Sequence, residues 1–271
     1  MSFEKKRPVE LIFLGSGGPF TLPQFFCRCE VCNAARKNPS QCRTRASVAI
    51  IGEEVTLIDA GPDLEMQLER ENIHRVDNIF ITHWHYDHIA GLGSVGYPQA
   101  MYGWNPIDIY VPKNLATHFD NELAFLKERL VLHPIVPSDV AELSDAEWEV
   151  VKTEHTMNSV GFIINSEKKV AYLVDTALPP NDTTLRIRDA DLLIVDAMLD
   201  SIDTEWRHFT VQEAIEYCKS TGIPDCILTH LSCHRWENQR WLAGLSHSQR
   251  LDLERDNPGI RFAYDGMRVQ I

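Results

Sequence analysis

Short apolar runs separated by turn residues predict a chain that is rich in strands. Runs of about four to eight apolar or alternating residues are typical of strands when Gly, Pro or Asn bounds them. The first run ends in the turn formed by Gly15, Gly17 and Gly18. The predicted strands cover residues 9–15, 46–52, 53–61, 76–83, 107–112, 148–155, 159–165, 168–177, 190–199 and 225–232, and two more lie within 260–271.

Other segments have the periodicity of amphipathic helices. Residues 62–72 place Leu64 and Leu68 four positions apart behind Pro62, a residue suited to a helix start. Residues 210–222 predict a helix capped at Thr210 and stopped at Gly222. Residues 114–130 also have helical spacing. The aromatic, acidic segments around Trp236 and Trp241 are expected to be helices, and they are candidates for a homodimer interface.

Hairpins followed by alternating strands and helices favour an α/β architecture of two sheets covered by helices. No repeat, low-complexity tract or linker divides the chain, so residues 1–271 are interpreted as one domain. The exception is the long Cys-rich loop at about 16–45. A loop of that length is expected to have a function or to be held by additional bonds.

The charge balance narrows the possible partners. The chain has 39 acidic and 26 basic residues, a net charge of -13, which speaks against a nucleic-acid partner. Small anionic substrates remain compatible, because bound cations can reverse the local field. No apolar stretch approaches the ~20 residues of a membrane span, and the N-terminal apolar run is shorter than a signal-peptide core. We therefore expect a cytoplasmic protein without a membrane partner.

The segment ITHWHYDHIAGL, residues 81–92, crowds three histidines and an aspartate into six positions. In an extended segment His83, His85 and Asp87 point to one side, and Trp84 and Tyr86 point to the other, where they can pack. His88 then turns toward the same volume as a helix begins. Imidazole with carboxylate suits zinc, iron or manganese, so we interpret the segment as a metal site.

Further candidate ligands follow three other predicted strands. His155 ends KTEH, Asp175 lies in YLVDTA, and His230 lies in ILTHLS. A single His or Asp at a strand end is usually only solvated. Together they predict a second set of donors at one rim of the sheet pair.

Seven cysteines in a chain expected in the cytosol point to thiols or metal ligands rather than disulfides. Cys27, Cys29 and Cys32 lie within six residues, a spacing suited to a structural zinc that would hold the long loop. The fourth ligand stays open among Cys233, His234 and the nearby Cys42.

THWHYDHIAGL resembles the signature of the metallo-β-lactamase superfamily, and LIDAG with Asp59, the histidine motif, His155, Asp175 and His230 appear in the family order. The resemblance implies a single-domain, four-layer αββα sandwich with two divalent metals, Mn or Zn. It implies that His83, His85 and His155 hold one metal, that Asp87, His88 and His230 hold the other, and that Asp175 bridges them opposite a bridging hydroxide. Asp59 would orient ligands or cap the turn before Pro62.

Several further motifs resemble the PhnP-like group of phosphoribosyl 1,2-cyclic phosphate phosphodiesterases: LGSGGP, the Cys-rich loop, RTRAS, VDTA, LTHLS and YDGM. His208, just before a helix cap, resembles the phosphodiesterase histidine beside the metals, and it is our candidate general acid. Catalysis would then depend on His208, Asp87 and Asp175. The group has a His at the position of Cys233, and the spacing favours Cys233 over His234 as the fourth zinc ligand.

The resemblance implies hydrolysis of a small phosphodiester, either a phosphoribosyl cyclic phosphate or a 2′,3′-cyclic nucleotide. Alternatives are a tRNA 3′-processing nuclease, a cofactor-biosynthesis member without turnover, and a thioesterase or lactamase. Tyr97, Tyr102 and Trp104 are available for stacking at a wall of the site or for core packing. Arg43, Arg45 and Arg207 are candidates for phosphate contacts.

Overall fold

Two seven-stranded sheets form the centre of the computed structural model, which describes residues 9–198, 207–237 and 240–271. The strands of the first sheet are β1 (Glu10–Gly15), β2 (Ser47–Ile51), β3 (Val55–Ile58), β4 (Asn78–Phe80), β5 (Ile107–Pro112), β6 (Leu130–Ile135) and β16 (Arg268–Gln270). Their order is β16-β1-β2-β3-β4-β5-β6. Strands β3 to β6 are parallel to one another.

The second sheet has the order β15-β12-β11-β10-β9-β8-β7. Its strands are β7 (Val140–Glu142), β8 (Glu147–Lys152), β9 (Val160–Asn165), β10 (Lys169–Leu173), β11 (Leu192–Asp196), β12 (Asp225–Thr229) and β15 (Ile260–Phe262). Strands β10, β11, β12 and β15 are parallel. A separate hairpin joins β13 (His234–Glu237) to β14 (Arg240–Ala243).

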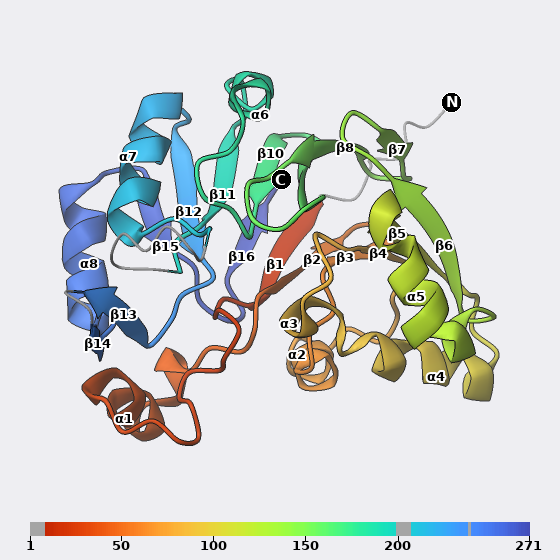
Figure 1. Cartoon of the computed structure of the whole chain (residues 1–271), viewed down its shortest axis with the longest axis horizontal. Helices are drawn as coiled ribbons and strands as arrows, with labels where there is room; N and C mark the ends of the chain where they lie inside the picture. Colours follow the sequence, from red (N-terminus) through yellow and green to blue (C-terminus); the bar gives the residue numbers. More distant parts are fainter. Residues whose placement is uncertain (1–8, 199–206, 238–239) are drawn as a thin grey trace, which may run out of the picture.

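Helices cover the outer faces of both sheets (Figure 1). Helices α7 and α8 lie on the second sheet, and α2, α4 and α5 lie on the first. The helices are α1 (Glu30–Lys37), α2 (Leu64–Arg70), α3 (Tyr86–Ile89), α4 (Leu92–Tyr102), α5 (Ala116–Glu122), α6 (Asn181–Arg186), α7 (Val211–Thr221) and α8 (His247–Asp256). Short 3₁₀ turns occupy Pro39–Gln41, Lys113–Leu115 and Ala124–Leu126.

Alternation along β1 shows why the chain forms layers. Leu11 and Phe13 enter the core between the sheets, whereas Ile12 and Leu14 enter the core beneath the helices. Successive strand residues point to opposite faces, so a continuous apolar run fills two cores at once. Three such cores separate four layers, which confirms the predicted αββα sandwich in a single domain.

The predicted elements are largely confirmed, including the helix with Thr210 as N-cap and Gly222 in the left-handed region at φ 73°. The long helix predicted over 114–130 is wrong. The segment breaks into two 3₁₀ turns and α5, and Leu130 begins β6 instead. Pairing of β6 with the buried strand β5 outweighs the local helical periodicity.

Several other segments also differ from the sequence expectation. The segments around Trp236 and Trp241 form the β13–β14 hairpin rather than helices, with these two positions opposite each other. Their side chains lie outside the described part of the structure, so the dimer interface stays a prediction. The loop at 16–45 contains α1, and α4 and α8 were not predicted. None of the described helices has the length and apolar character needed to cross a bilayer.

Candidate metal and active site

The histidine motif leaves the carboxyl end of β4 and reaches the rim where the two sheets meet. The carbonyl of Thr82 accepts a hydrogen bond from the backbone N–H of Val160 in the other sheet, at 3.0 Å. Strands β3, β4, β10, β11 and β12 all end near this rim, because parallel strands bring their carboxyl ends to one edge. Residues that follow these strands are therefore gathered together.

The backbone of the motif is extended only as far as His85, at φ -84° and ψ 151°. Helix α3 begins at Tyr86, so Asp87 comes from a helical turn and not from the extended segment that we expected. Tyr86 is 66% exposed, which contradicts its predicted packing role. Trp84 does pack, against the core beneath the helices, and its Nε1 donates to Glu122 at 3.2 Å.

The first predicted ligand group is brought together. One ligand atom each of His83, His85 and His155 lies within 4.8 Å of the other two. His85 Nδ1 is 2.9 Å from His83 Nε2 and 3.2 Å from His155 Nε2. Three imidazole nitrogens thus converge on one point, as a metal ion requires.

The second predicted group also converges. Ligand atoms of Asp87, His88 and His230 lie within 4.8 Å of one another. Asp175 lies between the two groups. Its Oδ2 is 3.7 Å from His83 Nε2 and 3.5 Å from His88 Nε2, and its Oδ1 is 3.2 Å from His230 Nε2. Asp175 is therefore placed to contribute ligand atoms to both groups.

Partners on the outer side turn the inner ring nitrogens toward the centre. The Nδ1 atoms of His83 and His88 lie 2.9 Å from Thr82 Oγ1 and 2.6 Å from Asp59 Oδ2. His155 Nδ1 lies 3.3 Å from the carbonyl oxygen of Arg207. When Nδ1 carries the proton, Nε2 has a free lone pair for a metal.

Asp59 lies where the predicted orienting role requires it. It is fully buried and accepts hydrogen bonds from the N–H of Thr82 at 2.8 Å and from His88. Its backbone is left-handed at φ 63°, a conformation uncommon outside Gly, Asn and Asp. The carboxylate fastens the start of the motif to strand β3 and does not cap the turn before Pro62.

Asp196 is a functional candidate that the sequence reasoning missed. It ends β11 as Asp175 follows β10, and it is completely buried. Its Oδ2 lies 2.5 Å from His208 Nδ1, and its Oδ1 accepts from the N–H of Met198 at 2.8 Å. The signal was present in the sequence: ADLLIVDAML is a buried strand with a single carboxylate near its end, like YLVDTA.

His208 lies beside both ligand groups. Its ring centroid is 4.6 Å from that of His155 and 5.2 Å from that of His230. Ligand atoms of Asp175, Asp196, His208 and His230 also lie within 4.8 Å of one another. The structure therefore brings the predicted general acid to the metal candidates, with Nδ1 held by Asp196.

The charges of the site fit divalent cations. Burial alone would lower the pKa of His88, but Asp59, Asp175 and Asp87 raise it well above the ordinary value. Burial opposes the charged form of Asp175, yet His230 and His88 hold its pKa well below the usual range. Burial lowers the pKa of His155 to about 4, so its imidazole is neutral and has a lone pair for a metal.

Unsatisfied polar atoms support the same conclusion. Asp175 Oδ1, His88 Nε2 and both ring nitrogens of His230 are buried without a hydrogen-bond partner among the described residues. Buried polar atoms usually have a partner, and a metal ion would be the partner of these atoms. Imidazole nitrogens and carboxylate oxygens are ligands for zinc, manganese or iron, and a further carboxylate can orient such an imidazole. The residues therefore fit two divalent ions.

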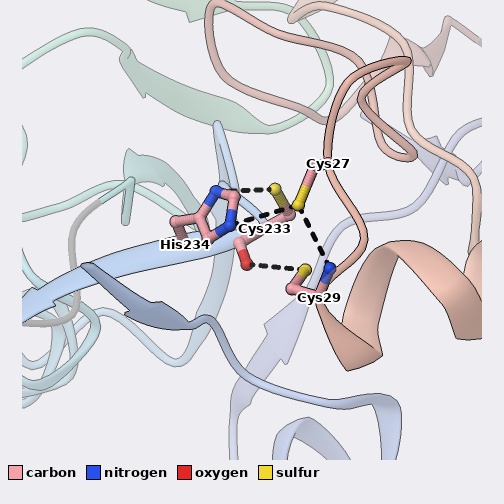
Figure 2. Close-up of side chains that lie close together, drawn as sticks. All are labelled: Cys27, Cys29, Cys233 and His234. Atoms are coloured by element: carbon pink, nitrogen blue, oxygen red, sulfur yellow. Dashed lines mark hydrogen bonds between the residues drawn. The ribbon is translucent and has the colours of Figure 1, made fainter.

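A second cluster joins the Cys-rich loop to the segment that follows β12 (Figure 2). Ligand atoms of Cys27, Cys29, Cys233 and His234 lie within 4.8 Å of one another. Cys27 Sγ is 3.2 Å from His234 Nε2, and Cys233 Sγ is 3.1 Å from His234 Nδ1. The two alternatives for the fourth ligand, Cys233 and His234, are thus both at the cluster.

Cys32 and Cys42 differ in their positions. Cys32 is fully buried in the same apolar cluster as Cys27 and Cys233, and its sulfur accepts from the N–H of Gln24 at 3.4 Å. The sulfur of Cys42 instead donates to the carbonyl of Ala35 at 3.6 Å. Thiolates with an imidazole suit zinc, and a zinc here would tie the loop of α1 to the hairpin beside it.

Two of the three candidate arginines form their hydrogen bonds or ion pairs with residues outside the ligand groups. Arg43 is buried and donates to Ser16 Oγ at 2.6 Å and to the carbonyl of Ala263, and burial lowers its pKa to about 9. Arg45 pairs with Asp63 at 3.0 Å. Arg207 is exposed beside His155 and pairs with Glu154 at 3.0 Å.

The candidate stacking residues are not core residues. Tyr97 and Tyr102 on α4 are 59% and 72% exposed, and Trp104 is 46% exposed. A groove of about 830 Å³ beside His155 is lined by residues 112–114, 135–137 and 152–160 and by Arg207, and none of the three aromatic residues lines it. The stacking role stays a prediction.

Comparison with known proteins places the chain in a family. Residues 55–231 match the model of the β-lactamase superfamily domain, which covers Asp59, the histidine motif and every active-site ligand candidate. The chain belongs to the β-lactamase superfamily. Members of this superfamily are hydrolases that use divalent metals such as zinc.

Three similar proteins illustrate the range within the superfamily. A crystal structure of a diphosphatase from the PhnP family is 25% identical, with a TM-score of 0.82, and the match covers 97% of this chain and 98% of that one. Coenzyme PQQ synthesis protein B of Methylorubrum extorquens PA1 is 29% identical over 69% of this chain and 72% of its own length. An octanoyltransferase of Porphyromonas gingivalis W83 is 25% identical over 96% of this chain, which spans 51% of that protein.

Proposed function

We propose that this member of the superfamily is a metal-dependent phosphodiesterase that hydrolyses small cyclic phosphates. Phosphoribosyl 1,2-cyclic phosphates and 2′,3′-cyclic nucleotides are the substrate types. The observation that carries the proposal is His208, a histidine beside both ligand groups whose Nδ1 is held by a buried carboxylate. The likeness to a diphosphatase of the PhnP family supports hydrolysis at a phosphorus centre.

The residues present would hold two divalent ions. His83, His85 and His155 would bind one ion and Asp87, His88 and His230 the other, with Asp175 shared between them. When bound, two such ions act as Lewis acids on a phosphoryl oxygen and lower the pKa of water. Thr82, Asp59 and the carbonyl of Arg207 keep the ligand rings in the orientation that this requires.

His208 would supply the proton that the leaving oxygen needs. Asp196 holds Nδ1–H and stabilises the imidazolium, so Nε2 is the atom that donates. Burial favours the neutral form of Asp196, but His208 and His230 lower the pKa of this carboxyl. Asp196 therefore stays an anion and can stabilise a positive charge on His208.

Hydrolysis of bis(p-nitrophenyl) phosphate and 2′,3′-cyclic AMP by protein loaded with Mn²⁺ or Zn²⁺ tests the proposal. We expect turnover of both, and we expect Asp175→Ala to abolish it while circular dichroism shows a retained fold. If neither phosphodiester is hydrolysed by protein with confirmed metal content, the proposal fails. A panel of thioesters would then examine the thioesterase alternative.

The similarity to a coenzyme PQQ synthesis protein favours a second candidate function, a role in cofactor biosynthesis without phosphodiester turnover. Metal-loaded protein that is inert toward phosphodiesters, thioesters and lactams would favour that role. A tRNA nuclease is disfavoured by the net charge of -13. Binding and cleavage of a precursor tRNA would reverse that ranking.

A further inference from the structure

Helix α4 presents a group of large apolar side chains to solvent. Its inner side packs in the core beneath the helices, whereas Tyr97 and Met101, one turn apart, lie on the outer side. The ring centroid of Phe125 lies 6.3 Å from that of Tyr97, and the ring centroids of Tyr102 and Trp104 lie 6.4 Å apart. We call Tyr97, Met101, Tyr102, Trp104 and Phe125 together the α4 face.

The α4 face is large enough to form the centre of an interface. Its exposed fractions run from 46% for Trp104 to 74% for Met101. An aromatic side chain has about 150–250 Å² of surface, so the four aromatic residues alone expose roughly 500 Å². The largest apolar patch on a monomer is typically about 300–600 Å². A stable dimer buries about 800 Å² on each copy, which this face reaches with a modest polar rim.

The segment that carries most of the α4 face has no charge, although the chain is strongly acidic. Residues 89–107 contain no Asp, Glu, Lys, Arg or His, whereas charged residues make up 24% of the chain. The centres of protein interfaces are likewise depleted of charge and enriched in aromatic residues and Met. Two copies of a protein with a net charge of -13 repel each other over most of their surface. A second copy can therefore approach most closely where neither copy presents a charge.

A groove of about 200 Å³ adjoins the α4 face and lies between α2 and α4. Its apolar lining includes Leu68, Pro98 and Trp104, so the groove and the face share one residue. Its polar lining includes Glu69 and Arg75, which bring both signs of charge to the rim. A two-fold dimer uses the same patch on both copies. A surface that has protruding side chains beside an apolar groove can fit a copy of itself in this way.

We propose that the α4 face is a dimer interface that binds a second copy of this chain about a two-fold axis. The inference moves the expected homodimer contact from the segments around Trp236 and Trp241 to α4. It does not rest on the phosphodiesterase proposal, because the active-site ligand groups are assembled from residues of one chain. Helix α4 begins at Leu92, four residues after His88. The second copy would thus cover the helix that directly follows the histidine motif.

Light scattering after size exclusion tests the proposal by measuring the mass in solution at micromolar concentrations. The four proteins are the wild type, Met101→Glu, Phe125→Glu and Leu185→Glu. The first two variants place a carboxylate in the α4 face. Leu185 provides the matched control, because it is an exposed leucine of α6, which lies far from α4 (Figure 1). Circular dichroism and metal content check that each variant keeps the fold.

We expect twice the mass of one chain for the wild type and for Leu185→Glu. Met101→Glu and Phe125→Glu should each raise the dissociation constant of the dimer at least about 100-fold, because a two-fold contact would then bury two unpaired carboxylates. Both should elute as folded monomers with the metal content of the wild type. A monomeric wild type, a dimer that survives both variants, or an equal loss in Leu185→Glu would overturn the inference. None of these results would bear on the phosphodiesterase proposal.

Hydrogen exchange in the wild type locates the contact without any variant. The measurement compares protein well above and well below the dissociation constant of the dimer. Slower exchange of residues 92–104 in the concentrated sample supports the α4 face. Unchanged exchange of these residues rejects it, and slower exchange of residues 234–243 instead would assign the contact to the β13–β14 hairpin.

Discussion

Asp196 Oδ2 lies 2.5 Å from His208 Nδ1, and the same carboxylate lies 3.7 Å from His230 Nδ1 through its other oxygen. One buried anion therefore contacts both the proposed acid and a proposed metal ligand. The contact joins the end of β11 to a residue two positions before Thr210, the N-cap of α7. The contact orients the ring of His208 and so sets the direction in which Nε2 points.

Replacing His208 tests the acid role, and the size of the effect should depend on the leaving group. General acid catalysis contributes about 10²- to 10⁴-fold. His208→Ala should lose that factor in kcat on 2′,3′-cyclic AMP, whose leaving alkoxide needs a proton. On bis(p-nitrophenyl) phosphate the loss should be clearly smaller, because p-nitrophenolate is a weak base. Equal losses of kcat on the two substrates, together with a reduced metal content, would instead mark His208 as a metal ligand.

Asp196→Asn keeps the shape of the side chain and removes its charge. We expect kcat on 2′,3′-cyclic AMP to fall about 10²-fold, because the amide no longer stabilises the imidazolium of His208. Metal content, measured by plasma emission, should stay close to that of the wild type. Activity that stays within about threefold of the wild type would contradict the positioning role of Asp196.

The variant Asp59→Asn tests whether Asp59 orients the metal ligands, without adding strain to the backbone. Asparagine tolerates the left-handed backbone at φ 63° but is a weaker acceptor for Thr82 and His88. Losing such an outer partner typically costs about 10- to 100-fold in metal affinity or activity. Competition with a fluorescent chelator should show this loss for one of the two active-site ions, and excess metal should restore part of the activity. Unchanged affinity for both ions would argue against the orienting role.

The cysteine cluster predicts a structural ion that is separate from catalysis. Cys29→Ser should release about one zinc per chain and lower the melting temperature, since a zinc-tied loop adds its binding free energy to folding. Cys42→Ser is the matched control, because the sulfur of Cys42 donates to the carbonyl of Ala35 and is not part of the ligand group of Cys27, Cys29, Cys233 and His234. If Cys29→Ser keeps wild-type zinc and stability, the structural zinc is rejected. Comparing Cys233→Ala, His234→Ala and Cys32→Ser then identifies the remaining ligands.

Asp265 is expected to be a major support of the N-terminal turn. Its Oδ1 accepts from Ser16 N–H and Oγ–H at 3.0 and 2.8 Å, and its Oδ2 accepts from Thr44 N–H and Oγ–H at 2.7 Å each. Removing this partly buried charged acceptor leaves these donors unpaired, so Asp265→Ala should cost about 2–4 kcal/mol in the free energy of unfolding. Urea denaturation measures it.

The exposed Asp256→Ala provides the control for Asp265→Ala and should stay within about 0.5 kcal/mol of the wild type. A similarly small change for Asp265→Ala would show that solvent replaces the lost bonds.

The sequence alone determined the two-sheet architecture and the residues that gather at the rim. Strand periodicity is a local property, and residues that follow parallel strands share one edge, so His83, His155, Asp175 and His230 could be placed together without coordinates. The spacing of the cysteines likewise indicated a metal cluster before its partners were known.

Only the tertiary structure decided which distant groups touch. It placed Asp196 against His208, brought His234 as well as Cys233 to the cysteine cluster, and broke the expected helix at 114–130 so that β6 could pair with β5. These outcomes depend on contacts between segments far apart in the chain, and their energies compete with local preference. Periodicity describes one segment at a time, so it carries no information about that competition.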